Sequence, residues 1–62
     1  MVRVTYRERT YTFEGKVTGS LILKELGLRE EEVLLVKDGQ LLPPDEPLKD
    51  GEVKVVPVVS GG

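Results

Sequence analysis

The chain has 62 residues, a formal net charge of −2, and neither cysteine nor histidine. It can therefore form no disulfide and no cysteine–histidine zinc site, and it lacks the commonest general base and nucleophile, so we do not expect an autonomous enzyme. Its acidic and basic residues are interleaved, which argues against nucleic-acid binding. Its apolar runs are too short for a membrane span or a signal peptide, so we expect a cytoplasmic protein.

Two further features of the composition concern size and source. A chain of 62 residues forms one domain at most, with little room for a catalytic cleft. There is no asparagine and a single glutamine, while 32% of the residues are charged. Few thermolabile residues and many charges are typical of thermophilic proteins, so we expect a thermophilic source.

The first fifteen residues predict a β-hairpin. Residues 2–6 and 10–14 alternate between apolar and polar side chains, and the polar residues 7–9 connect them. Gly15 ends the pair. One face of the hairpin should then carry Val2, Val4, Tyr6, Tyr11 and Phe13.

A short helix follows. Residues 21–26 place leucine and isoleucine at helical spacing, and either Thr18 or Ser20 can cap the first turn. Gly27 stands where a left-handed residue ends a helix, and Leu28 offers the apolar contact that usually follows. A helix this short needs a sheet to pack against.

A second pair of strands is predicted next. The charged residues 29–32 form a solvated connection to an apolar run at 33–37. Asp38-Gly39 makes a tight turn into residues 40–42. Pro43-Pro44 stops that strand, which indicates an edge position.

The last segment is predicted to be the longest strand. Residues 45–48 form a loop or a single 3₁₀ turn, and 49–51 a further turn. Residues 52–58 are rich in valine and form the strand, with Pro57 marking the point where ladder hydrogen bonding ends. The one helix must cover one face of the sheet, because no other layer exists.

The chain closes with Val59, Ser60, Gly61 and Gly62. Two consecutive glycines let a backbone pass through a channel too narrow for other residues, which indicates a functional carboxylate at Gly62. The same composition is typical of a linker or a frayed end. The residues alone leave both interpretations open.

In size, element order and closing sequence, the chain resembles the ubiquitin-like sulfur carriers and small modifiers. Among these are the thiamin-pathway sulfur carrier, the small subunit of molybdopterin synthase and small archaeal modifiers. Their typical features are an Asp-Gly turn, a valine-rich last strand and a terminal Gly-Gly. Here they stand at Asp50-Gly51, at Val53, Val55 and Val56, and at Gly61-Gly62.

The resemblance implies a fold and a division into two parts. The fold is α+β: a ubiquitin-like β-grasp of ββαβββ order, with one helix packed on one face of a mixed sheet. The last strand runs parallel to the first at the centre of the sheet. Residues 1–58 form the domain, which we expect to be a monomer without a cofactor, and 59–62 form a flexible Gly-Gly tail.

The resemblance also implies a mechanism. A partner related to the ubiquitin-activating enzymes would use ATP to adenylate the Gly62 carboxylate. A sulfur donor would convert it to a thiocarboxylate, which a synthase would use for cofactor biosynthesis or tRNA thiolation. Gly61 would provide clearance in the partner's channel, while Val59 and Ser60 would act as a spacer.

Strand parity predicts a docking surface for this partner. If Val53 and Val55 face the helix, Val56 and Val58 point to the uncovered side of the sheet. One register of residues 33–37 also leaves two apolar side chains on that side, and we select Leu34 and Val36 as candidates. The alternative is that these side chains merely cover the second face of the sheet.

Three other functions stay open. The chain could be a protein modifier that forms isopeptide bonds with lysines, or a β-grasp interaction module whose tail is never activated. It could also be an enzyme subunit whose tail enters a larger catalytic partner, although it is short for that group. The sequence does not choose the acceptor of the activated Gly62.

Overall fold

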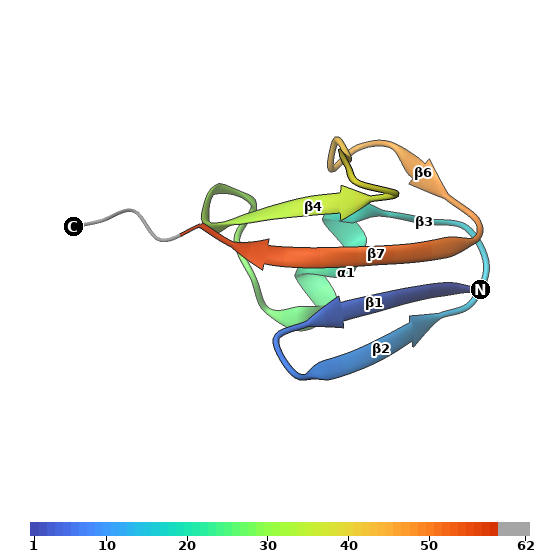
Figure 1. Ribbon diagram of the computed structural model, residues 1–62. Helices are drawn as coiled ribbons and strands as arrows, with labels where there is room; N and C mark the ends of the chain where they lie inside the picture. Colours follow the sequence, from blue (N-terminus) through green and yellow to red (C-terminus); the bar gives the residue numbers. More distant parts are fainter. Residues whose placement is uncertain (59–62) are drawn as a thin grey trace.

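The computed structural model describes residues 1–58 and shows a mixed β-sheet with one α-helix behind it (Figure 1). An exposed 3₁₀ turn, η1, precedes the fourth strand. The elements are β1 (Val2–Tyr6), β2 (Arg9–Phe13), β3 (Val17–Thr18), α1 (Gly19–Leu26), η1 (Glu30–Glu32), β4 (Val33–Lys37), β5 (Gln40–Leu41), β6 (Pro47–Leu48) and β7 (Gly51–Pro57).

The main sheet has the strand order β2-β1-β7-β4-β5. Its central strands, β1 and β7, are parallel, in a register that places Val4 beside Val53. The other pairs are antiparallel. A parallel pair needs a long crossover connection, and α1 lies within it. The predicted α+β β-grasp arrangement is confirmed.

The first hairpin has the predicted face. Val2 lies opposite Phe13 and Val4 opposite Tyr11, so the apolar residues of both strands share one side. Strand β2 begins at Arg9, one residue earlier than expected. The turn therefore contains only Arg7 and Glu8, with Arg7 in the left-handed region at φ 57°.

Of the two predicted caps, Thr18 is the one that caps the helix, which begins at Gly19. The Thr18 hydroxyl accepts a hydrogen bond from the Leu21 amide at 3.2 Å. At the other end, Gly27 has φ 74°, its amide donates to the Lys24 carbonyl, and the Leu28 amide donates to Leu23. This pair of bonds is the Schellman motif, so the predicted glycine cap is confirmed.

The core lies between α1 and one face of the sheet. Ile22 and Leu23 of α1 are fully buried, as are Val4 and Val53 of the central strands. Tyr6, Tyr11 and Phe13 pack at its margin.

The described residues contain no helix long and apolar enough to cross a membrane.

A second, two-stranded sheet was not predicted. Val17 of β3 pairs with Leu48 of β6, and both are only 6% exposed. The prediction of a loop or 3₁₀ turn over residues 45–48 is therefore wrong for residues 47–48, which form β6. The reason is physical: two-residue strands show no alternation, and only the tertiary contact that buries Leu48 defines the strand.

The end of β7 differs from expectation by one residue. The strand ends at Pro57, but the Val58 amide still donates to the Glu32 carbonyl at 2.8 Å. Pro57 lies opposite Val33, between the hydrogen-bonded pairs of the ladder. Because that position needs no donor toward β4, proline does not interrupt the ladder there. Hydrogen bonding therefore continues to Val58.

Candidate functional site

The predicted tail, Val59, Ser60, Gly61 and Gly62, lies outside the described residues. What the structure does describe is the strand that leads into it. Val58 is the last residue in this part and lies next to the start of β4. The surface around Val58 is therefore the part of the candidate site that geometry can describe.

Strand β7 presents different residues to its two sides. Val53 and Val55 are 1% and 3% exposed and face α1. Val56 and Val58 are 37% and 45% exposed. Because successive side chains of a strand alternate between faces, Val56 lies on the side opposite the helix. We call this uncovered side the open face.

Strand β4 pairs with β7 in the register that places the candidates Leu34 and Val36 on the open face. Val33 and Leu35 are buried, whereas Leu34 is 43% exposed and Val36 half-buried. Leu34 lies directly opposite Val56 in the ladder. Leu34 and Val56 are thus neighbours on the open face, as cross-strand pairs are.

One residue of this surface was missed by the sequence analysis. Leu41 of β5 is 68% exposed and lies opposite Val36. The signal was present, because the two-residue turn at Asp38-Gly39 fixes which residues of β4 and β5 face each other. We define the apolar patch as Leu34, Val36, Leu41, Val56 and Val58.

The remainder of the open face is polar. Threonines of β2 and the charged residues of β1 and β7 cover it, and Arg3 pairs with Glu52 at 3.0 Å. In the parallel register Arg3 lies beside Glu52 and Thr5 beside Lys54. The patch is therefore confined to β4, β5 and the last part of β7.

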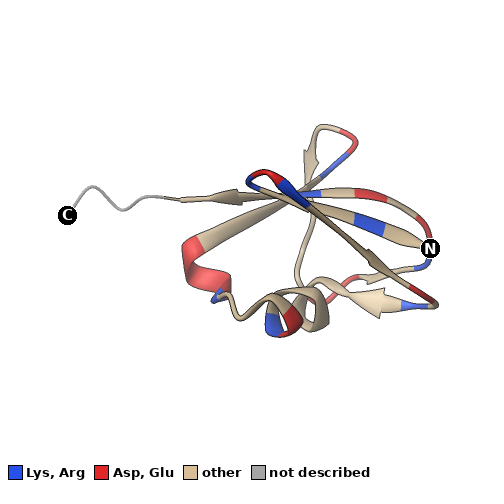
Figure 2. Ribbon diagram, turned by 90° about the horizontal axis from the view of Figure 1, so that it is seen from below, with Lys and Arg blue, Asp and Glu red and all other residues tan. Residues whose placement is uncertain are grey.

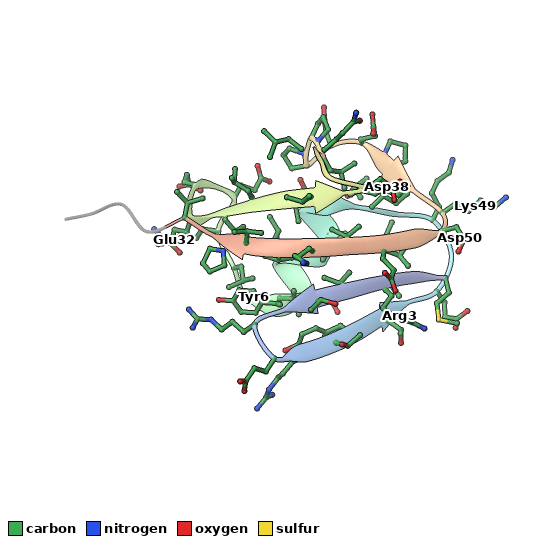
Figure 3. All side chains as sticks on the ribbon, in the orientation of Figure 1. Arg3, Tyr6, Glu32, Asp38, Lys49 and Asp50 are labelled. Carbon is green, nitrogen blue, oxygen red and sulfur yellow. The ribbon has the colours of Figure 1, made fainter. Side chains whose placement is uncertain are left out.

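Charged elements flank the end of β7. Figure 3 shows Tyr6 and Glu32 at this end, and Lys49 and Asp50 at the opposite end. Arg7 Nε donates to the Tyr6 hydroxyl at 3.2 Å, and this hydrogen bond raises the pKa of Arg7 above its ordinary value. On the other side, the three glutamates of η1 form an acidic turn (Figure 2).

The described residues contain no candidate metal centre. Within residues 1–58 no group of three carboxylates is arranged to hold a metal ion. The buried side chains of this part are all apolar. The chemistry that this surface can perform is recognition, through an apolar patch beside the strand that leads into residues 59–62.

Comparison with known proteins gives two matches. The family described as small archaeal modifier protein 2 matches residues 2–59. An uncharacterized protein of Archaeoglobus fulgidus is 51% identical over 43 residues, which are 69% of this chain. The matched segment spans 64% of the length of that relative.

Proposed function

Because the chain belongs to the family of small archaeal modifier proteins, which are ubiquitin-like β-grasp proteins, we propose that it acts through the carboxylate of Gly62. A partner of the ubiquitin-activating kind adenylates it: the carboxylate attacks the α-phosphate of ATP and pyrophosphate leaves. The acyl-adenylate then has a good leaving group, which a free carboxylate lacks. The chain itself supplies a substrate rather than a catalyst.

The observation that carries the proposal is the continuity of β7 with the tail. Val58 of the apolar patch directly precedes residues 59–62, and Val56 lies two residues earlier. Four residues reach at most about 14 Å when extended. A partner that docks on the patch therefore has to place its nucleotide site within that distance of Val58. The short segment 59–62 thus links the docking surface to the reacting carboxylate of Gly62.

Two fates of the adenylate are proposed. The family's description as modifiers favours attack by the ε-amine of a lysine, which loses a proton as AMP leaves and gives an isopeptide bond. In a sulfur carrier, hydrosulfide attacks the same acyl carbon, AMP leaves and the proton of the hydrosulfide is lost, which gives a thiocarboxylate at Gly62. The chain has no cysteine, so no thiol of its own competes for the activated acyl group.

Pyrophosphate exchange tests the shared first step. The full chain is incubated with ATP, labelled pyrophosphate and an archaeal enzyme of the ubiquitin-activating kind. We expect ATP–pyrophosphate exchange that depends on the chain and is lost when Gly62 is deleted. Exchange that persists without Gly62, or its absence in the full chain with every available activating enzyme, contradicts the proposal and favours a non-activated interaction module.

Intact mass then separates the two fates. With sulfide present, replacement of one oxygen by sulfur on Gly62 identifies the carrier. With a mixture of cellular proteins, a Gly62–lysine remnant after proteolysis identifies the modifier. A shift at any other residue of the chain would contradict both assignments.

Docking on the patch is tested with a matched pair of variants. Val56→Asp puts a charge within the patch, whereas Thr12→Asp puts the same charge on the polar half of the open face. We expect Val56→Asp to raise the KM for activation about tenfold, equivalent to about 1.4 kcal/mol, with kcat nearly unchanged. Equal effects of the two variants would show that the partner does not dock on the apolar patch.

A further inference from the structure

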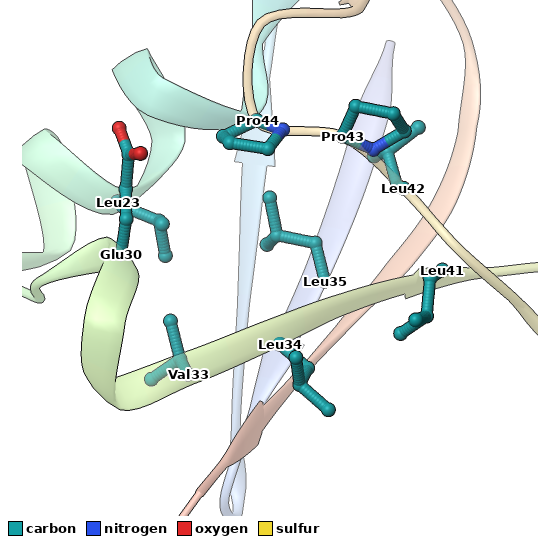
Figure 4. Close-up of a pocket in the computed structure, with 9 residues that line it drawn as sticks. All are labelled: Leu23, Glu30, Val33, Leu34, Leu35, Leu41, Leu42, Pro43 and Pro44. Atoms are coloured by element: carbon teal, nitrogen blue, oxygen red, sulfur yellow. The ribbon is translucent and has the colours of Figure 1, made fainter.

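An apolar groove lies at the β5 edge of the sheet, beside the site proposed above. Its volume is about 300 Å³, at the lower end for ligand pockets. It lies beside the first half of β4, which β5 does not cover, and Figure 4 shows Leu35 pointing into it. The lining residues are Leu23, Glu30, Val33, Leu34, Leu35, Leu41, Leu42, Pro43 and Pro44.

The groove contains one residue of strand edge, Val33, that pairs with no strand on this side of β4. The last hydrogen bond on this side of β4 is donated by the Leu42 amide to the Leu35 carbonyl, at 2.8 Å. The backbone amide and carbonyl of Leu34 point toward β7. Because these groups alternate in direction along a strand, those of Val33 point to the same side as those of Leu35. No backbone bond joins Val33 to Pro43 or Pro44.

Two prolines keep this edge open. Neither Pro43 nor Pro44 has an amide hydrogen to offer the Val33 carbonyl. The Pro44 carbonyl is already occupied, since it accepts from the Ser20 amide at 2.7 Å. The segment after β5 is thus held against the start of α1 instead of completing the ladder. Such an edge is a template for another strand.

The groove has an acidic rim. Glu30 is the charged residue among the nine lining side chains, and Figure 4 shows it at one end of the lining. Its Oε2 accepts from the Ser20 hydroxyl at 2.9 Å, and its Oε1 can accept from a further donor. Glu31 and Glu32 follow on the same turn, and Asp45 and Glu46 follow Pro44. A basic ligand is therefore favoured.

We propose that this groove binds an extended peptide segment of a partner protein. The backbone of the segment pairs with the amide and carbonyl of Val33, and its aliphatic side chains fill the space between Leu35 and Pro44. A lysine or arginine next to those side chains pairs with Glu30. This interaction needs neither Gly62 nor ATP, although the groove shares Leu34 and Leu41 with the apolar patch.

Peptide binding to the full chain tests the proposal. The probes are two fluorescent peptides with the same valine–isoleucine core, one flanked by lysines and one by glutamates, and binding is read by anisotropy. We expect the lysine peptide to bind about fivefold more tightly, with the difference shrinking as salt is added. Equal affinities, or no binding of either peptide, would overturn it.

A pair of charge reversals locates the effect. Glu30→Lys and Glu14→Lys change the net charge equally, but Glu14 follows β2, on the opposite edge of the sheet. Only Glu30→Lys should invert the preference between the two peptides. If both variants shift it equally, the preference reflects net charge, and the assignment to the groove is wrong.

Amide resonances identify the pairing. On addition of the lysine peptide, the Val33 amide should shift most and exchange its hydrogen more slowly, while Val56, which lies opposite Leu34 on the open face, shifts less. Deletion of Gly62 should leave this response intact. Shifts centred on Val56 would assign the peptide to the apolar patch, and self-association that covers Val33 without peptide would assign the groove to a second copy; either result overturns the proposal.

Discussion

The two faces of the main sheet are built from the same strands but serve different purposes. On the covered face, Val53 and Leu35 lie under α1 and are 1% and 4% exposed. On the open face, Val56 and Leu34 of the same two strands are 37% and 43% exposed. Valine and leucine thus stabilise the domain on one side and stay available for contact on the other.

Strand register keeps these two roles apart. A slip of one residue would move the apolar residues of a strand to the other face. The turn at Asp38-Gly39, with φ of 53° and 77°, holds β4 and β5 in place, and the β4–β7 ladder extends to Val58. Burial rather than residue type therefore decides which valines matter for folding. Four predictions test this difference.

The largest effect is expected from matched truncations in β7. Val53→Ala should lower the free energy of unfolding by about 2–3 kcal/mol, because it removes buried methyl groups and leaves a cavity. Val56→Ala, the same change on the open face, should cost less than about 1 kcal/mol. Urea denaturation of both variants measures the difference. Similar losses would show that the open face is part of the core.

A smaller effect is expected where α1 contacts the covered face. A Cβ at Gly19 would meet the Leu35 side chain and would lie 3.0 Å from the Pro44 Cα. Gly19→Ala should therefore destabilise the domain by about 1–2 kcal/mol, despite the better helix propensity of alanine.

Combination with Leu35→Ala is the control for Gly19→Ala. Removing the Leu35 side chain gives the new methyl group room, so the two changes should cost less together than the sum of each alone. Thermal melting of the single and double variants measures the coupling. Simple additivity would show that the close approach at Gly19 has no energetic consequence.

Much of this arrangement could be predicted from sequence, where local rules and burial agree. The alternation in residues 2–6, the turn at 38–39 and the glycine at 27 each correctly placed an element. The apolar residues 34 and 36 were expected on the open face, and the structure places them there. Whether they bind a partner stays a prediction.

What could not be predicted depends on contacts distant in sequence. Pairing of β3 with β6 joins segments about thirty residues apart and carries no periodic signal. The open edge at Val33 results from the path of Pro43-Pro44 toward Ser20, which composition does not encode. The left-handed Arg7 also lacks a signal, since that conformation favours glycine or asparagine.

An effect of about 1 kcal/mol is expected at the helix cap. Thr18→Ala removes the hydroxyl that accepts from the Leu21 amide, whereas Ser20→Ala removes only an exposed bond to Glu30. We expect Thr18→Ala to lower the melting temperature more than Ser20→Ala. If Ser20→Ala lowers the melting temperature more, then Ser20 caps the helix instead of Thr18, and α1 begins later in the chain.

The smallest effect is expected on the polar half of the open face. Arg3 and Glu52 are 3.0 Å apart, but their side chains are 57% and 73% exposed. Water screens such a pair, so a double-mutant cycle with Arg3→Ala and Glu52→Ala should give a coupling below about 1 kcal/mol that falls as salt is added. A larger, salt-independent coupling would mean that this half of the face contributes to stability as the covered face does. A small coupling leaves burial under α1 as the main source of stability and the whole open face available for contact.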